Sequence, residues 1–364
     1  MRSRNVSKGH LPAAILLIAS GPSGALADTV LYTSSNASAG NAVIEIGQAD
    51  DGSLSILGSY PTGGAGTDTG LGNQGAIAVD GDFLFVINAG SDEVSSFRRL
   101  DTGLSLVSTV PSGGARPVSL TVDRDVLYVL NAGSDNIAGF FVSEEGALSA
   151  ISGSSRPLSG VGTAPAQISF SKDGRVLVVT EKATNNLLSF PVRRDGLTGS
   201  AQVFPSPGQT PFGFAVTKGR RILVSEAAGG AAGASSVTSW RVSPQATLTV
   251  LDPVEPTLQA AACWVAVTPD GRFAFTTNTG SGTISAYRVR GDDLSLVDAD
   301  GQAASTGPGS APIDMVISPD GRFLHSLNGG ADEIGSFRIG QDGSLTPVGT
   351  LPGLPDRATG LASG

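Results

Sequence analysis

Cysteine and histidine are almost absent from this chain of 364 residues. Cys263 is the single cysteine, so no disulfide can form within the chain, and its stability has to come from a large core. The two histidines are His10 and His325. That number is too small for a metal site built from several histidines, and it argues against a Ser-His-Asp triad and most other histidine-based acid–base schemes.

Positive charge and long apolar runs are also scarce. The chain has 23 Lys and Arg against 32 Asp and Glu, a formal charge of -9, and an acidic surface disfavours nucleic acid and membranes as partners. The apolar run from Leu11 to Ile18 is too short to span a bilayer. It follows Arg2, Arg4 and Lys8 and precedes Ala25-Leu26-Ala27, the pattern of a signal peptide over residues 1–27. We therefore expect export to the periplasm or the medium, as a mature domain of residues 28–364 with a charge of -12 (20 cationic against 32 acidic side chains).

Internal repeats are what the sequence does contain. Asn88-Ala89-Gly90-Ser91-Asp92 returns as Asn131-Ala132-Gly133-Ser134-Asp135, each time after a hydrophobic run of strand character. Tight turns such as Pro269-Asp270-Gly271-Arg272 lead into these runs, and Asp-Gly between alternating hydrophobic segments predicts an antiparallel hairpin. The six runs that follow such turns are predicted strands at Phe83–Asn88, Val126–Asn131, Val176–Glu181, Arg221–Glu226, Phe273–Asn278 and Phe323–Asn328.

A second column of the repeat places an aromatic residue three positions after a β-branched residue or leucine. Six of seven units follow this rule, from Val94 and Phe97 to Ile334 and Phe337, whereas Val43 and Ile46 hold these places in the first unit. A unit of about 48 residues (337/7) containing only strand signals predicts a propeller blade. We predict an all-β, seven-bladed β-propeller with four antiparallel strands per blade. The segment Arg357–Ala362 supplies the strand that the N-terminal blade lacks and so closes the ring.

The ends of the predicted second strands, with the starts of the first strands, mark one rim of the central tunnel. Asparagine and aspartate there are also typical turn residues, so a structural role is an alternative for each asparagine. Glutamate is a poor turn former, and for this reason Glu226 and Glu181 are our candidate catalytic residues. The candidate ligand-binding residues on this rim are Arg116, Gln167, Trp264, Asp314, Asn88, Asn131, Asn278 and Asn328.

Other side chains are predicted to be structural. His325 shares a column with Phe85, Tyr128 and Phe275, which indicates a buried histidine, and Cys263 is expected to be a buried thiol. No loop has the acidic spacing of a calcium site, so we expect neither a metal nor a cofactor. The Ala/Gly-rich insertion Gly229–Ser236 is either a lid over the rim or a surface loop.

The repeats resemble those of the lactonase-type seven-bladed propellers, which include bacterial 6-phosphogluconolactonases and fungal carboxymuconate cyclases. The resemblance rests on Ser318–Leu324, Asn328–Phe337 and Asp342-Gly343-Ser344-Leu345, and Leu127–Asn131 is similar to the YVTN-type repeat. It implies a site at the tunnel mouth where histidine, arginine and glutamate act on a carboxylated or phosphorylated lactone. The Gly-Pro-Arg-His motif of the family falls on Thr210–Gly213, so this chain has neither the arginine nor the histidine. The following glutamate falls on Glu226.

Two functions remain open from the sequence. The first is a hydrolase that opens a small lactone at the tunnel mouth, with Glu226 or Glu181 as the general base and Arg116 or the asparagines holding the carbonyl oxygen. The second is a non-catalytic exported propeller, monomeric, that binds a lactone, a sugar or a protein partner through the same rim.

Overall fold

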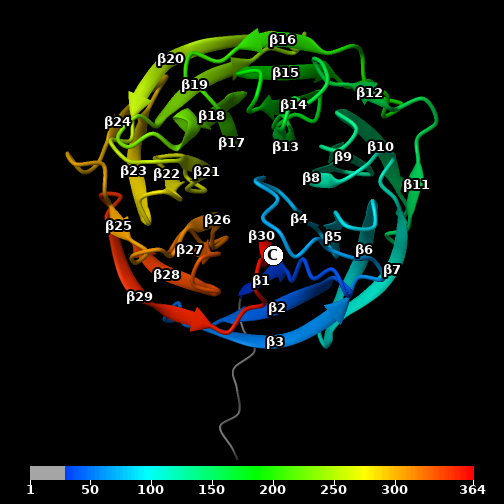
Figure 1. Ribbon diagram of the computed structural model, residues 1–364, viewed down its shortest axis with the longest axis horizontal. Helices are drawn as coiled ribbons and strands as arrows, with labels where there is room; N and C mark the ends of the chain where they lie inside the picture. Colours follow the sequence, from blue (N-terminus) through cyan, green and yellow to red (C-terminus); the bar gives the residue numbers. More distant parts are fainter. Residues whose placement is uncertain (1–28) are drawn as a thin grey trace, which may run out of the picture.

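The computed structural model describes residues 29–364, and these form a ring of seven four-stranded antiparallel sheets around a central tunnel (Figure 1). The predicted signal peptide lies outside the described residues. Within them the only helix is a single 3-10 turn, η1 (Ala228–Gly230), and no helix has the length and apolar character needed to cross a bilayer. The predicted fold class is therefore confirmed.

The first strand of each blade lines the tunnel and pairs antiparallel with the second. The first strands, in blade order, are β30 (Thr359–Ser363), β4 (Ile77–Asp80), β8 (Pro117–Asp123), β13 (Pro165–Phe170), β17 (Pro211–Thr217), β21 (Ala262–Val267) and β26 (Pro312–Ile317). The second strands are β1 (Thr29–Ser34), β5 (Phe83–Asn88), β9 (Val126–Asn131), β14 (Val176–Glu181), β18 (Arg221–Glu226), β22 (Phe273–Asn278) and β27 (Phe323–Asn328).

The third and fourth strands form the outer half of each blade. The third strands are β2 (Ala42–Gln48), β6 (Glu93–Leu100), β10 (Asn136–Val142), β15 (Asn186–Pro191), β19 (Ser236–Val242), β23 (Thr283–Arg290) and β28 (Glu333–Ile339). The fourth are β3 (Leu54–Pro61), β7 (Gly103–Pro111), β11 (Leu148–Ala150), β16 (Gln202–Pro205), β20 (Leu248–Pro256), β24 (Asp293–Leu296) and β29 (Leu345–Pro352). Two short strands, β12 (Arg156–Pro157) and β25 (Ala304–Ser305), extend the third and sixth blades.

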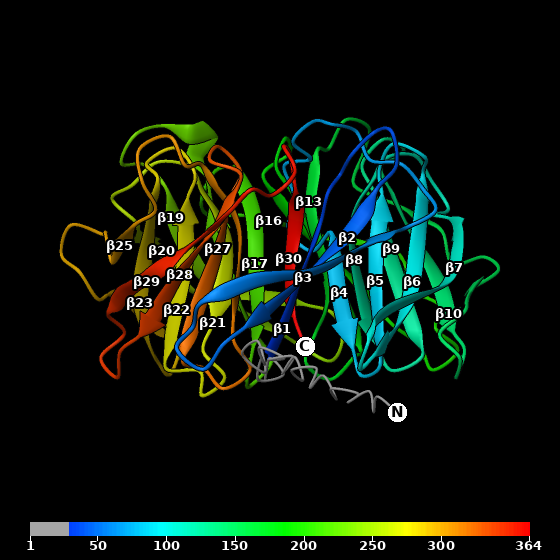
Figure 2. The same cartoon turned by 90° about the horizontal axis from the view of Figure 1, so that it is seen from below.

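The ring is closed by β30, which pairs with β1 in the N-terminal blade (Figure 2). This pairing completes the N-terminal blade and ties the two ends of the described chain together. Between the blades, the predicted aromatic column of the third strands is buried, from Phe97 through Trp240 to Phe337. The hydrophobic core is divided among the blade boundaries. A destabilising substitution at one boundary is therefore expected to lower the stability of the whole ring.

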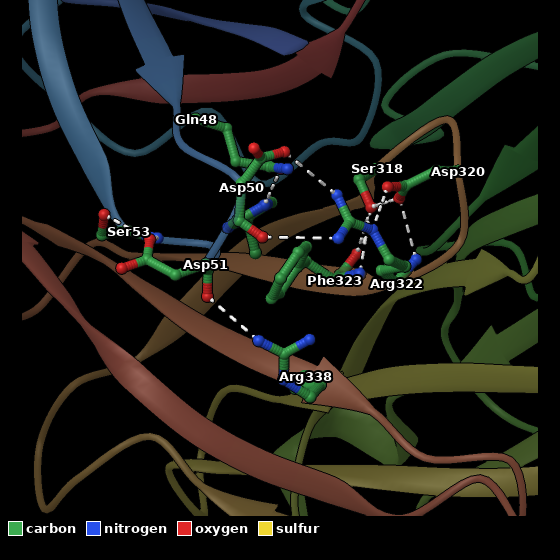
Figure 3. Close-up of polar contacts among 10 residues, drawn as sticks. Gln48, Asp50, Asp51, Ser53, Ser318, Asp320, Arg322, Phe323 and Arg338 are labelled. Atoms are coloured by element: carbon green, nitrogen blue, oxygen red, sulfur yellow. Dashed lines mark hydrogen bonds and ion pairs between the residues drawn. The ribbon is translucent and has the colours of Figure 1, made fainter. Parts of the chain in front are cut away.

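The boundary between the last and first blades shows how the outer turns are held (Figure 3). The Phe323 ring lies between two guanidinium groups, with Arg322 Cζ 5.3 Å and Arg338 Cζ 4.7 Å from its centroid. Arg338 also donates a hydrogen bond of 3.3 Å to the Asp51 carbonyl of the first blade. Gly52, which follows Asp51, packs directly on the ring, because a Cβ at this position would lie 2.3 Å from Phe323. Gly146 on Phe83 and Gly343 on Phe273 repeat this contact in other blades.

We predict that Gly52→Ala destabilises the fold by about 2–4 kcal/mol. The backbone of Gly52 has a φ of +90°, where a Cβ is strained by about 1 kcal/mol, and displacing the stacked ring adds a further overpacking cost of about 1–3 kcal/mol. Gly271→Ala is the matched control, since Gly271 has a φ of +79° but no atom within 4 Å of the added methyl group. Urea unfolding at constant pH measures both variants, and equal losses would show that the Phe323 contact carries no stability.

Candidate functional site

The four predicted asparagines at the strand ends are all buried and hydrogen-bonded within the blades. Asn88 is typical: its Oδ1 accepts from Thr62 Oγ1 at 2.7 Å and Asn41 Nδ2 at 3.0 Å, and its Nδ2 donates to Ser95 Oγ at 2.8 Å. Thr62 and Asn41 belong to the preceding blade, so Asn88 fastens one blade to the next. Asn131 donates to the Ser112 carbonyl and Asn278 donates to Ser285 Oγ. Asn328 donates to Glu333 Oε1.

The two candidate glutamates are enclosed in the same way. Glu181 is fully buried and accepts a 3.0 Å hydrogen bond from the Ser159 backbone N–H, with further bonds from the Ser159 and Thr184 hydroxyl groups. The loop that carries Ser159 leads from the third blade into the fourth. This geometry favours an anchoring role for Glu181, and its catalytic role stays a prediction.

Glu226 is 1% exposed, and three hydroxyl groups surround its carboxyl. Ser236 donates at 2.9 Å, Ser206 at 3.3 Å, and Thr238 through a short hydrogen bond. Burial raises the pKa of Glu226 to about 8, and the three hydroxyl donors only partly offset this effect. A catalytic base needs contact with its substrate, which these three hydroxyl groups exclude in this conformation. The catalytic role of Glu226 is therefore also a prediction that the geometry does not favour.

Gln167 and Asp314 bridge neighbouring first strands at the tunnel wall. The Gln167 side-chain amide accepts from the Phe214 N–H at 2.6 Å and donates to the Phe214 carbonyl at 2.9 Å. This pair of hydrogen bonds resembles the backbone pairing of two residues in adjacent β-strands. Asp314 accepts from the Leu361 N–H at 3.1 Å, which pins the closing strand β30, and burial raises the pKa of this carboxyl. Both side chains therefore hold neighbouring blades together, and neither is exposed at the rim.

A segment that the sequence analysis did not single out fills the tunnel mouth. Residues 72–76, which precede β4, cross from the second blade into the centre of the ring (Figure 1). The Gln74 amide donates to the Val265 carbonyl at 3.1 Å in the sixth blade, and the Gln74 backbone N–H bonds to Ala166 O in the fourth. A Cβ on Gly213 of the fifth blade would lie 2.1 Å from Gln74 Oε1. We call residues 72–76 the plug.

Lys182 lies at the edge of the plug. Its ammonium donates to the Gly72 carbonyl and, at 3.5 Å, to the Pro165 carbonyl, and it lies 4.7 Å from the Phe212 ring centroid. Burial lowers the pKa of Lys182 to about 8; the Cys263 thiol opposes this shift and the Arg116 guanidinium adds to it. Arg116 is exposed on the rim. The rim therefore carries two cationic side chains from adjacent blades, one of them titrating near neutral pH.

The apolar wall beside Lys182 consists of Phe212 and Trp264, whose ring centroids are 5.1 Å apart. Trp264 is buried, and its indole N–H has no hydrogen-bond partner among the described residues. Next to it, burial raises the pKa of the Cys263 thiol to about 11, which makes this thiol a poor nucleophile. Of the predicted ligand-binding residues, Arg116 and Trp264 are thus the two that lie near Lys182, and the others are held by hydrogen bonds within or between the blades.

His325 is a buried core residue, as its column in the repeat predicts. Its ring nitrogens lie 2.9 Å from Ser336 Oγ and 2.7 Å from Gln48 Oε1, and burial lowers the pKa of the imidazole to about 4. Across residues 29–364, no group of three or more His, Cys, Asp or Glu side chains is arranged to hold a metal ion.

Several solved structures share this fold. A protein from Lactobacillus plantarum aligns with a TM-score of 0.75 at 17% identity, over 92% of this chain and 98% of its own. A putative 6-phosphogluconolactonase from Bacteroides fragilis aligns with a TM-score of 0.68 at 19% identity, over 94% and 99%. The periplasmic gluconolactonase of Pseudomonas aeruginosa gives 0.68 and 19%, over 91% and 98%. At these identities the likeness shows the fold alone.

Among curated protein sequences no match was found. The sequence itself does match the family described as lactonase, 7-bladed beta-propeller, over residues 27–156 and 225–356, which is well over half of the chain. Together with the ring of seven blades, this match shows that the chain belongs to the lactonase family of seven-bladed β-propellers.

Proposed function

We propose that this propeller hydrolyses a small lactone at the tunnel mouth, with Lys182 as the acid–base residue. The observation that carries the proposal is the position of Lys182 at the tunnel mouth, where its ammonium bonds to the Gly72 and Pro165 carbonyls on the rim that also carries the exposed Arg116. Burial lowers the pKa of Lys182 to about 8, with a smaller contribution from Arg116, and amines that titrate near the working pH are efficient proton carriers. The family match and the gluconolactonase neighbours agree with this chemistry.

The reaction that fits the geometry is attack of water on the lactone carbonyl. The neutral amine of Lys182 takes a proton from the water as its oxygen bonds to the carbonyl carbon, and the negative charge that develops on the carbonyl oxygen is stabilised by Arg116. The tetrahedral intermediate then collapses, the ring C–O bond breaks, and the Lys182 ammonium returns the proton to the departing ring oxygen. The product is the open hydroxy acid, and Lys182 is neutral again.

Substrate binding would use the surroundings of the amine. The carbonyl oxygens of Gly72 and Pro165 hold the Lys182 Nζ in place by hydrogen bonds, which pre-orients it for proton transfer. The buried indole N–H of Trp264 offers a donor to a substrate hydroxyl when the plug shifts.

The direct test is lactone opening followed by pH-stat titration at pH 8 over a small panel. The panel contains δ-gluconolactone, 6-phosphogluconolactone and an unsubstituted γ-lactone, each corrected for spontaneous hydrolysis. We expect turnover of at least one sugar lactone by the wild-type protein. Absence of turnover on every member would refute the proposal and favour a non-catalytic binding propeller.

Export is part of the same proposal. The charged start, the apolar run and the small residues before Asp28 support a cleaved signal peptide, and one structural neighbour is named as periplasmic. N-terminal sequencing of the protein after expression in a bacterial host would show Asp28 as the first residue, whereas an intact Met1 would contradict this assignment.

A further inference from the structure

A cleft of about 660 Å³ lies between the first and second blades, at the end of the ring opposite the Lys182 rim. Strands β1, β2 and β3 of the first blade and the β6–β7 hairpin of the second enclose it. Its volume falls within the range of small-molecule sites. The side chains used in the argument below are Tyr32, Glu45, Leu57, Tyr60, Arg99 and Leu100.

The first blade departs from the repeat at one residue of this cleft, Glu45. Glu45 pairs across the sheet with Tyr32, and the same position in the other six blades holds a small residue. Those six residues, each opposite the matching position of the second strand, are Ser96, Gly139, Ser189, Ser239, Ala286 and Ser336. The first blade also has Ile46 where the others have an aromatic ring. A carboxylate that is 7% exposed has thus been introduced at a place that the fold fills with a hydroxyl, a methyl group or nothing.

The backbone around Glu45 accommodates one particular partner, Tyr60. The Tyr60 hydroxyl donates to Glu45 Oε2 at 2.8 Å. It reaches this oxygen between two glycines, since a Cβ on Gly58 would lie 2.7 Å and one on Gly103 1.9 Å from the hydroxyl oxygen. Burial and the Glu45 carboxylate raise the pKa of Tyr60, so the phenol stays a donor at neutral pH. Of the seven blades, the first alone has this carboxylate–phenol pair, because the other six have a small residue in place of Glu45.

Arg99 adds a further polar side chain at the base of the cleft, and we call these polar groups, Glu45, Tyr60, Tyr32 and Arg99, the polar floor. Its Nε donates to the Tyr32 hydroxyl at 3.2 Å and its Nη1 to the Gly81 carbonyl at 2.8 Å, and the guanidinium lies 5.6 Å from the Tyr32 ring centroid. Above this floor, Leu57 and Leu100 are about half exposed, at 53% and 50%. The cleft therefore has several hydrogen-bond donors and acceptors at its base and apolar side chains at its edge.

The charges narrow the class of ligand. Three carboxyl side chains line the cleft, Glu45, Asp82 and Asp101, against the single guanidinium of Arg99, so an anion is disfavoured. The carboxyl groups would attract a cation, but the Arg99 guanidinium already occupies the face of the Tyr32 ring, so that ring is not free for a cation–π contact with a ligand. A purely apolar ligand would cover the polar floor without pairing it, which is unfavourable. A neutral molecule with many hydroxyl groups and apolar C–H faces meets all three conditions.

We propose that this cleft binds a neutral carbohydrate of about disaccharide size, with sugar hydroxyls bonded to Glu45 and Arg99 and a sugar face packed on Leu57 and Leu100. The site is independent of the proposed lactone site, from which it differs in position and in the sign of its charge. It gives an exported propeller a second, non-catalytic means of contact with glycans.

Isothermal titration calorimetry of the full chain with maltose and cellobiose tests the proposal, with glucuronate and glucosamine as charged probes. We expect saturable binding of at least one neutral disaccharide and weaker binding of both charged sugars. Glu45→Gln should lower the affinity about tenfold, because it removes a charged acceptor of sugar hydroxyls, and Leu57→Ala should lower it about threefold. Leu258→Ala is the matched control, since Leu258 is an exposed leucine, at 45%, far from the cleft in sequence and blade.

Three results would overturn the inference: no binding of either disaccharide by the wild type, binding that is unchanged in Glu45→Gln, or tighter binding of glucuronate or glucosamine. Circular dichroism and unfolding curves show whether each variant is folded, and Tyr60→Phe provides a second variant that keeps the ring and removes only the hydroxyl. Failure here is separable from failure of the lactonase proposal. Lys182→Met should bind disaccharides like the wild type, and Glu45→Gln should open lactones like the wild type.

Discussion

Lys182→Met is expected to open lactones at least about 100-fold more slowly than the wild-type protein, because general acid–base catalysis by one side chain is worth about 10²–10⁴-fold. The loss should fall on kcat, since the amine acts in the chemical step. For the wild type, kcat/KM should rise with pH and level off above an apparent pKa of about 8, the value that burial gives Lys182. The sign follows from the role: only the neutral amine accepts the proton of water, and its fraction grows as pH passes through 8. Initial rates by pH-stat between pH 6.5 and 9.5, corrected for spontaneous opening, measure both effects.

Lys182→Arg separates the proton-transfer role from the charge. Arginine keeps the positive charge but stays protonated over this pH range, so this variant should be nearly as slow as Lys182→Met. Lys172→Met is the matched control, because Lys172 is exposed in the turn before β14, and it should retain wild-type rates. A Lys182→Met variant with wild-type turnover, or a flat wild-type profile between pH 7 and 9, would remove Lys182 from the mechanism.

The blades were predictable because their signals are local. All six predicted second strands have the bounds that the structure shows, since a tight turn, in four of them Asp-Gly, opens each hairpin and a hydrophobic run follows. The closing strand was predicted from Arg357 and begins at Thr359. Arg357 has a φ of +66°, so it belongs to the turn before the strand. Such a backbone conformation depends on how the tail meets the ring, and the repeat carries no information about it.

The candidate site was less predictable, because its geometry depends on contacts between blades. The strand-end residues lie at the predicted rim, but hydroxyls of the preceding loop enclose them, such as Ser206 around Glu226 and Ser159 around Glu181. The plug, which carries Gln74, was not predicted from the sequence. Positive φ at Gly72 and Gly75 turns the chain across the tunnel, and β4 begins at Ile77. Lys182 was not among the predicted site residues, since its burial follows from the plug and from Phe212.

The repeat also explains which exceptions carry function. At positions 181 and 226, Glu replaces Asn, and hydroxyl or backbone donors bind the longer side chain. The carboxyl groups are therefore hydrogen-bonded inside the protein. Where Glu45 replaces a small residue, its two phenol neighbours and Arg99 face an open cleft. A departure from the repeat therefore indicates a ligand site when its polar groups line a cleft, as they do around Glu45. Where neighbouring blades satisfy them, the departure indicates a structural fastening.

Glu226→Gln is expected to change the pH dependence of stability by several kcal/mol. Burial raises the pKa of Glu226 from 4.5 to about 8, so between these values the folded protein holds a proton that the unfolded chain has released. The free energy of unfolding of the wild type should therefore fall as pH rises from about 4.5 to 8, by about 3–5 kcal/mol from this group, and then level off. Glutamine is neutral throughout and removes this contribution.

Above pH 8, the glutamine variant should accordingly be more stable than the wild type by about 2–4 kcal/mol, and near pH 4.5 the two should be similar. The smaller figure allows for rearranged hydrogen bonds. The Trp240 indole donates to Thr238 Oγ1 at 2.8 Å, which commits the Thr238 hydroxyl to donate to Oε1, while Ser236 can turn to accept from the new amide. Urea unfolding at pH 4.5, 6.5 and 8.5 measures the difference, with the exposed Glu144→Gln as a control that should follow the wild type. Equal slopes for wild type and Glu226→Gln would show that the buried carboxyl does not titrate in this window. Loss of lactone turnover in the folded Glu226→Gln protein would instead support the catalytic role that the sequence predicts for this residue.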